Sequence, residues 1–127
     1  FNLEWSPGGD FLIASLESGV VVVLDTFHPD GLHRVCRFMA HENGTNVMSF
    51  DSEGRLFTGG VDGVARMWDF SKLCAARGDL ESEEGGGITQ FGLLREFVGH
   101  EDDVKNVCPL GSSILLTCSF DGTLRAW

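Results

Sequence analysis

Residues 58–69 read TGGVDGVARMWD, and residues 117–127 read TCSFDGTLRAW. In both stretches a Thr lies four positions before an Asp-Gly pair, and a Trp lies six positions after the Asp. A His also lies 21 residues before each Asp, His41 before Asp62 and His100 before Asp121. The same offsets occurring twice in 127 residues indicate a tandem repeat, and a repeat decides the fold before any single motif does.

A weaker third copy lies at the N-terminus. Ser18-Gly19 takes the place of the Asp-Gly pair, Ala14 takes the place of the Thr, and Leu24 takes the place of the Trp. From Leu24 to Trp68 is 44 residues, which fits the period of about 40–45 typical of four-stranded propeller blades. From Trp68 to Trp127 is 59 residues, so we expect an insertion of 15, and we place it at residues 77–92, which begin RGDLESEEGGG.

The segments between the marks have the pattern of strands. Residues 1–5 alternate apolar and polar side chains, and residues 20–24 are continuously apolar, as expected of a strand covered on both faces. An Asp-Gly pair between two such runs predicts a type I′ hairpin turn. We find no convincing helical period anywhere in the chain.

These marks resemble the WD40-repeat family, in which Gly-His, Asp-Gly and Trp-Asp elements recur. Here they correspond to residues 39–41 and 98–100, to the two Asp-Gly pairs, and to residues 67–69. The resemblance implies an all-β fold: a WD40 β-propeller fragment of about three blades of four-stranded antiparallel sheet, in an incomplete ring. We assign residues 1–38, 39–76 and 93–127 to blades and residues 77–92 to an acidic, Gly-rich insertion.

The resemblance also implies a role for the repeated polar residues. In this family the Trp ring N–H, a Thr hydroxyl, a His and an Asp form a buried hydrogen-bonded chain, and removing one member leaves the others unpaired at roughly 1–3 kcal/mol per group. The two expected tetrads are His41, Thr58, Asp62 and Trp68, and His100, Thr117, Asp121 and Trp127. The N-terminal copy lacks the set, so apolar packing alone is expected to hold its blade.

A catalytic interpretation of the same residues is the alternative, because His and Asp beside a hydroxyl are the parts of a nucleophile triad. Two identical sets fit architecture better than catalysis. Outside the repeat marks there is no nucleophile with a base, no carboxylate pair and no phosphate loop. We therefore expect no enzyme activity, no cofactor and no small-molecule substrate.

Charge and composition narrow the partners. The formal net charge is −10, which argues against nucleic acid, because phosphate contacts need clustered Lys and Arg. The sequence contains no run of 18 apolar residues, so we expect no membrane-spanning segment. The four Cys show no Cys-x-x-Cys pair, and Cys108 and Cys118 are expected to be buried, reduced thiols, as in the cytoplasm or nucleus. We also expect a piece of a longer protein, which by itself would be poorly soluble or oligomeric because its sheets have open edges.

Two local features allow both a functional and a purely structural interpretation. Residues 28–33, HPDGLH, could hold a metal, but a Pro-Gly turn is the expectation, and no metal site is predicted. Residues 79–84, DLESEE, are expected to be a solvated loop, and an acidic docking or phosphoacceptor segment at Ser82 is the alternative. Met48 and Met67 are expected in the core.

A closer resemblance is to the WD-repeat substrate receptors associated with cullin-4 RING ubiquitin ligases. It rests on residues 1–9, on residues 41–73, and on residues 99–100, 104–106 and 119–122. It implies two protein partners: the ligase's propeller adaptor on one side and a protein substrate on the other. The alternative is a general WD40 scaffold or signalling adaptor with no link to ubiquitin ligation.

The adaptor-contact motif of these receptors is Trp-Asp, one residue, then Arg. The matching positions are Trp68, Asp69 and Ser71, so the Arg is absent, and Lys72 supplies the nearest positive charge. Neighbouring positions of a strand face opposite ways, and Lys lacks the planar fork of Arg. These four residues are nevertheless the candidate adaptor contact.

Overall fold

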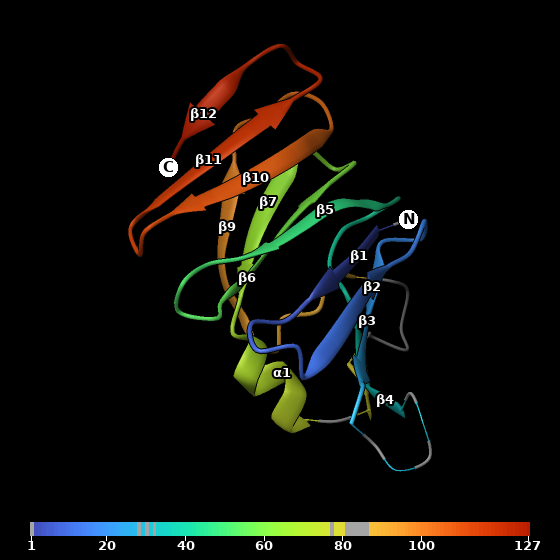
Figure 1. Cartoon of the computed structure of the whole chain (residues 1–127). Coiled ribbons are helices and arrows are strands. Elements are labelled where there is room, and N and C mark those ends of the chain that lie inside the picture. Colours follow the sequence, from blue (N-terminus) through green and yellow to red (C-terminus); the bar gives the residue numbers. More distant parts are fainter. Residues whose placement is uncertain (1, 28, 30, 32, 77, 81–86) are drawn as a thin grey trace.

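The computed structural model describes residues 2–27, 29, 31, 33–76, 78–80 and 87–127. Its strands form three mainly antiparallel sheets arranged one after another along the chain, as Figure 1 shows. The first sheet contains β1 (Asn2–Trp5), β2 (Phe11–Ser15), β3 (Val20–Asp25), β4 (His33–Met39) and, at its edge, the short parallel strand β8 (Gly78–Asp79). The second contains β5 (Thr45–Phe50), β6 (Leu56–Gly60), β7 (Val64–Trp68) and β9 (Leu93–Val98). The third contains β10 (Val104–Leu110), β11 (Ile114–Ser119) and β12 (Leu124–Ala126). The predicted all-β fold of a partial propeller is confirmed.

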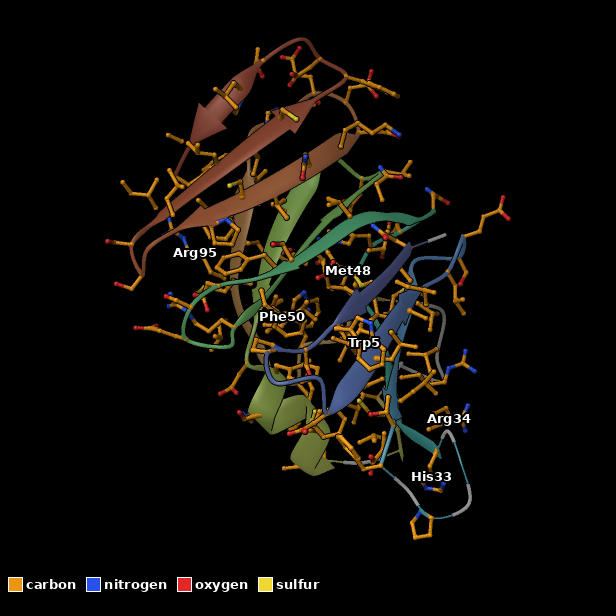
Figure 2. All side chains as sticks on the ribbon, in the orientation of Figure 1. Trp5, His33, Arg34, Met48, Phe50 and Arg95 are labelled. Atoms are coloured by element: carbon orange, nitrogen blue, oxygen red, sulfur yellow. The ribbon has the colours of Figure 1, made fainter. Side chains whose placement is uncertain are left out.

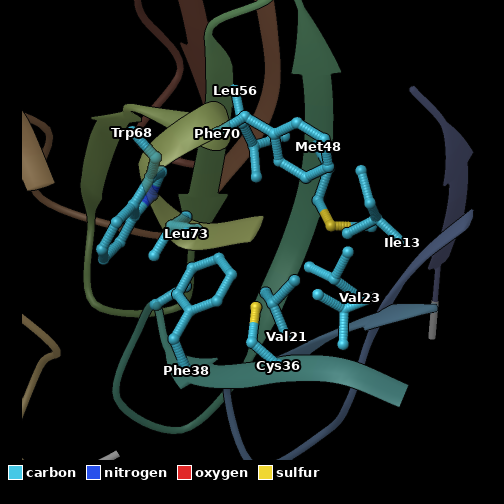
Figure 3. Packing of buried hydrophobic residues seen from close by; sticks show 12 residues of the cluster. Ile13, Val21, Val23, Cys36, Phe38, Met48, Leu56, Trp68, Phe70 and Leu73 are labelled. Atoms are coloured by element: carbon cyan, nitrogen blue, oxygen red, sulfur yellow. The ribbon is translucent and has the colours of Figure 1, made fainter. Parts of the chain in front are cut away.

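Two apolar layers hold the three sheets together. The layer between the first and second sheets includes Ile13, Val23, Phe38 and Trp68, each 0% exposed, and Figure 3 shows them in one cluster with Met48 on the side of Ile13. The layer between the second and third sheets is smaller and includes Phe57, Phe97, Val104 and Leu115. Burying one such side chain contributes about 1.5–3 kcal/mol, so these two layers are the main source of stability.

The boundaries of the sheets differ from the boundaries of the sequence repeats. Strand β9, which directly precedes His100, pairs with β7 through registers such as Arg66 opposite Glu96. The segment 69–92 therefore interrupts the second sheet between its third and fourth strands. A strand edge left open at β7 would expose unpaired N–H and C=O groups, and β9 satisfies them after the interruption.

A short helix, α1 (Phe70–Ala76), follows β7, where the sequence analysis expected none. Asp69 begins it: its side-chain Oδ1 accepts the Lys72 N–H at 3.1 Å, which is an N-cap bond. Phe70 and Leu73 are buried and pack against the layer between the first and second sheets. Two apolar side chains three positions apart are too few to give a helical period, so tertiary packing decides this helix.

The insertion is only partly a solvated loop. Strand β8 (Gly78–Asp79) pairs in parallel with Cys36 and Arg37 of β4, and the Leu80 N–H bonds the Arg37 C=O at 2.7 Å. Thr89, only 4% exposed, bonds the backbone of Met39 through both its N–H and its hydroxyl oxygen. Both ends of the insertion therefore cover the outer edge of the first sheet. Ser82 and its neighbours at 81–86 lie outside the described residues.

The Asp-Gly turns are not of type I′. Gly63 and Gly122 have φ of 77° and 84°, but the preceding Asp residues do not have positive φ. Each glycine N–H bonds the C=O three residues earlier, at 3.2 Å, as in hairpin loops that end in a left-handed glycine. The Asp side chains instead accept the backbone N–H two residues on, at Val64 and Thr123, which stabilises the turn.

The cysteine prediction was half right. Cys108 and Cys118 are reduced thiols, but Cys108 is exposed and Cys118 is only half-buried. Both lie in the third sheet, where residues such as Leu124 and Phe120 are 71% and 66% exposed, so little of the chain covers that part of the sheet. Cys36 is the buried one, and burial raises the pKa of its thiol to about 11. Of the two methionines, Met48 is buried and Met67 half-buried.

Candidate functional site

The structure brings His41, Thr58, Asp62 and Trp68 together in one hydrogen-bonded chain. The Trp68 Nε1–H donates to Thr58 Oγ1 at 3.0 Å, and Thr58 Oγ1 lies 2.7 Å from His41 Nε2. His41 Nδ1 lies 2.9 Å from Asp62 Oδ1. Because the indole can only donate and the carboxylate only accepts, the Thr58 hydroxyl donates to Nε2 and the Nδ1–H donates to Asp62.

The first tetrad is sealed from solvent. His41, Thr58 and Trp68 are each 0% exposed, and the Asp62 side chain is 15% exposed. Burial lowers the pKa of His41, which keeps the imidazole neutral. Burial alone would raise the pKa of Asp62, but hydrogen bonds and charge from His41 and Arg66 outweigh it and lower that pKa to about 2. The carboxylate is therefore ionised at neutral pH.

His100, Thr117, Asp121 and Trp127 form the second tetrad with nearly the same distances. Trp127 Nε1 donates to Thr117 Oγ1 at 2.9 Å, His100 Nε2 lies 2.7 Å from that oxygen, and Nδ1 lies 2.9 Å from Asp121 Oδ2. The Thr123 hydroxyl also donates to Asp121 Oδ1 at 2.6 Å. This bond, helped by those from His100 and two backbone N–H groups, lowers the pKa of Asp121.

The geometry favours bracing over catalysis at both tetrads. A nucleophile must be reached by its substrate, but Thr58 and Thr117 are 0% and 1% exposed. Each hydroxyl is also placed between an indole donor and an imidazole acceptor, so its proton and one lone pair are engaged. The arrangement can tie two neighbouring strands, the turn between them and the segment before the sheet into one unit.

Arg66 is the residue that the sequence analysis missed. It is 5% exposed, and its Nη1 donates to Asp62 Oδ2 at 2.8 Å and to the Ala40 C=O at 2.9 Å. Its Nε donates to Glu96 Oε2 of β9 at 2.9 Å. A signal was present, since Arg125 lies four residues after Asp121 just as Arg66 lies four after Asp62. An arginine at the same offset in both repeats is the sequence signal for a fifth member of the set.

The candidate adaptor contact lies where β7 passes into α1. Trp68 is fully buried and belongs to the tetrad and core, and Asp69 caps the helix. Ser71 and Lys72 are exposed in the first turn of α1, and the Lys72 ammonium lies 4.8 Å from the centre of the Phe91 ring. The expectation that positions 71 and 72 face opposite ways was wrong, because they lie in a helix, where neighbours are about 100° apart.

Metal and membrane sites can be considered only for the described part of the chain. There, no three His, Cys, Asp or Glu side chains group as metal ligands. His28, Asp30 and Leu32 of the suspected metal turn lie outside the described residues. Among the residues that the structure places, no helix is long and apolar enough to cross a membrane.

Comparisons with known proteins agree with this fold. A ribosome biogenesis protein WDR12 homolog of Drosophila erecta is 31% identical over 94 residues, which is 73% of this chain and 21% of that protein. The human DDB1- and CUL4-associated factor 10 is 30% identical over 129 residues, 100% of this chain and 20% of that protein. The computationally designed Ika4 protein superposes with a TM-score of 0.67 at 18% identity, covering 98% of this chain and 62% of the other.

The chain spans about a fifth of the length of these two curated relatives. The family model for the WD domain, G-beta repeat, matches residues 32–69 and 91–127. Each matched segment ends on the last marks of a repeat, Trp68-Asp69 in the one and Trp127 in the other. These matches cover more than half of the residues, and the chain belongs to the WD40-repeat family.

Proposed function

We propose that this chain is part of a protein-docking propeller that acts as the substrate-recognition subunit of a cullin-4 RING E3 ubiquitin ligase. WD40 domains mediate protein–protein interaction and are generally non-enzymatic scaffolds. The observation that carries the finer proposal is the similarity to DDB1- and CUL4-associated factor 10 of human, mouse and frog. That similarity extends over the full chain, at 27–30% identity. Under this proposal the protein works in the cytoplasm or nucleus, without a catalytic site of its own.

A second candidate function is a scaffold with no ligase link. The WDR12 homologs match at 29–31% identity over 94 residues, a similar identity over a shorter part of the chain. Ser71, where the resemblance leads one to expect Arg, also favours this candidate. Identity at this level follows from shared repeat residues as well as shared partners, so the site must decide.

The surface at the start of α1 is the place where the two candidates differ. Lys72 and Ser71 are exposed, and the cation–π contact with Phe91 holds the ammonium against the ring at 4.8 Å. Such a contact is worth about 0.5–1 kcal/mol at an exposed site and fixes a flexible side chain. Under the ligase proposal, Lys72 provides the positive charge that meets the adaptor, without the bidentate geometry of Arg.

Affinity capture of the full-length protein from cell lysate at mild salt tests the proposal. Recovery of DDB1 and CUL4 is expected with the native protein, and Lys72→Glu should reduce it strongly. Ser71→Arg should increase it, because it restores the expected residue at the first turn of the helix. Lys105→Glu is the matched control, since it reverses one charge on β10 of the third sheet.

Two outcomes would contradict the ligase proposal. One is that no adaptor or cullin is recovered with any variant, and the other is that a stable complex without either is recovered instead. If Lys105→Glu reduced the recovery of adaptor and cullin as much as Lys72→Glu does, the adaptor contact would not lie at α1.

A further inference from the structure

The first sheet lacks the side-chain bonds that tie the second sheet together. Ala14 of β2 and Leu24 of β3 take the register positions that Thr58 and Trp68 take in the second sheet. Ser18, in the place of the tetrad Asp, is exposed. Alanine and leucine side chains can neither donate nor accept a hydrogen bond, so β2 and β3 cannot form a tetrad of their own.

The fourth strand of the first sheet also lacks a side-chain bond that its counterpart has. In the second sheet, Arg66 of β7 binds Glu96 of β9. In the first sheet, Val22 takes the position of Arg66 and lies opposite Arg37 of β4. The start of β4, with Arg34, lies at the margin of the molecule (Figure 2). Valine can form no such bond, so β4 depends on its ladder with β3 and on the segment that covers its other edge.

The segment inserted between β7 and β9 provides this cover, and its described residues, 69–76, 78–80 and 87–92, are named the strap here. The Thr89 N–H donates to the Met39 C=O at 3.0 Å, and the Thr89 hydroxyl oxygen accepts the Met39 N–H at 2.9 Å. The same hydroxyl donates to the Leu80 C=O at 3.1 Å, and the Leu80 N–H donates to the Arg37 C=O at 2.7 Å. One buried threonine side chain therefore joins two parts of the strap to each other and to β4.

Apolar side chains of the strap enter the layer between the first and second sheets. Leu73 of α1 is 0% exposed and Phe70 is 8% exposed, and α1 packs against β4. Figure 3 shows both side chains in the cluster. Leu80 and Ile88 pack against the same cluster, which includes Val35 of β4. The strap is thus fixed by burial as well as by hydrogen bonds, and the first blade is held by more than the apolar packing of its own repeat.

We propose that the strap fastens the first sheet in place of the missing tetrad, and that its release opens the first sheet while the second stays closed. Release leaves the N–H and C=O of Met39 unpaired at the edge of β4, which weakens that edge. The second sheet keeps its own tetrad and the pairing of β7 with β9. Opening is therefore local and needs less free energy than unfolding of the whole chain. This conformational device does not rest on a link to a ubiquitin ligase.

Hydrogen exchange read by mass spectrometry on the full-length protein tests the proposal, with Thr89→Val as the main variant. Valine keeps the shape of threonine but leaves the Met39 N–H and the Leu80 C=O without their partner. Exchange of the amides in β3 and β4 should become about tenfold faster, which is the effect expected for unpaired buried groups. Exchange in β6 and β7 should stay as in the native protein. Thr89→Ser, which keeps the hydroxyl, should restore the native rates in β4.

Two matched variants show whether the effect belongs to the strap. Thr58→Val breaks the tetrad of the second sheet and should speed exchange in β6 and β7 but not in β4. Thr26→Val removes a hydroxyl of the first sheet that bonds the C=O groups of Gly9 and Asp10, away from the strap, and should leave β4 unchanged. Equal acceleration in both sheets by Thr89→Val, or acceleration of β4 by Thr26→Val as large as that by Thr89→Val, would overturn the proposal.

A native thiol gives a second measurement of the same opening. Cys36 of β4 is 0% exposed, so a maleimide reaches it only when the first sheet opens. Its labelling, located by mass spectrometry, should be about tenfold faster in Thr89→Val than in the native protein, and unchanged in Thr58→Val. Equal protection of Cys36 in the native protein and in Thr89→Val would contradict the role of the strap.

The native protein alone decides the question if Thr89→Val does not fold. In increasing, still non-denaturing concentrations of urea, the amides of β4 and the Cys36 thiol should become accessible through an opening with a smaller urea dependence than global unfolding. The amides of β6 and β7 should exchange only by a larger opening. If β4 and β6 exchanged through one common opening, the two sheets would open together and the proposal would be wrong.

Discussion

The second and third sheets contain the same tetrad of side chains with nearly the same hydrogen-bond lengths, but the surroundings of the two tetrads differ. In the second sheet, β9 pairs with β7, and Arg66 joins the tetrad to Glu96. In the third sheet, Arg125 occupies the equivalent position, and its Nε is buried without a hydrogen-bond partner among the described residues. Sequence marks therefore define the hydrogen-bonded chain, whereas the neighbouring strand determines how well it is enclosed.

This difference makes each equivalent pair of residues a matched experiment. If the enclosure by β9 and by the first sheet matters, substitutions in the second sheet should cost more than the same substitutions in the third. If the tetrad alone matters, the costs should be equal. The 127-residue chain, to which these exposed fractions belong, is the material to use, and the thermal midpoint and the free energy of unfolding are the measurements.

The largest difference is expected for Trp68→Ala and Trp127→Ala. Trp68 is 0% exposed and in contact with Phe38, so its removal should cost about 3–5 kcal/mol. Trp127 is half-buried, and its removal should cost roughly 1–3 kcal/mol. Trp→Phe at each position is the control, because it keeps an aromatic ring but loses the N–H. Equal losses from the two Ala variants would refute the role of enclosure.

The next difference concerns Arg66→Met and Arg125→Met. Removing Arg66 leaves the Ala40 C=O and one side of Asp62 without their donor, which should cost about 2–3 kcal/mol. Removing Arg125 takes away an unpaired buried Nε and should change stability by less than about 0.5 kcal/mol. Chemical denaturation of the two variants checks this, and a large loss of stability with Arg125→Met would show that the Arg125 guanidinium forms a stabilising contact.

How far the sequence predicts this structure can be seen in the same residues. Spacing located both tetrads, because a fixed offset along hairpins places side chains at fixed positions of a sheet. It did not locate Arg66 as part of the set, since an arginine on a strand is usually solvated. The type I′ turn was predicted from the Asp-Gly pair alone, but the Asp carboxylates instead bond to the backbone two residues on.

The elements that depend on tertiary packing could not be predicted from the sequence. Helix α1 has two buried side chains, Phe70 and Leu73, and its cap Asp69 follows the Trp as the repeat pattern requires, so no independent helix signal remained. The insertion looked solvated by composition, but Thr89 and Leu80 bond to the edge of β4. An edge that needs covering is visible only once the strand order is known.

Lowering the pH should reduce the difference in stability between the native protein and the Asp62→Asn variant. The pKa of Asp62 is about 2, against an ordinary 3.8, so the unfolded chain binds a proton more readily than the folded one does. Asp62 therefore contributes about 2 kcal/mol that is present above pH 4 and is lost as the pH falls towards 2. The gap in thermal midpoint between the native protein and Asp62→Asn should narrow across that interval, and a gap independent of pH would contradict this assignment.

The smallest effect is expected for the coupling between Arg66 and Glu96, which a double-mutant cycle with Arg66→Met and Glu96→Gln measures. Both Arg66 Nε and Nη2 lie 2.9 Å from the same Glu96 oxygen, but that side chain is 44% exposed. Solvent screens such a pair, so its coupling should be about 0.2–1 kcal/mol and should fall further in 0.5 M salt. The coupling of Arg66 with Asp62, whose side chain is 15% exposed, should be larger and nearly independent of salt. If salt weakened both couplings equally, β9 would not be shielding the Arg66–Asp62 pair from solvent. The contrast between the two sheets would then need another cause.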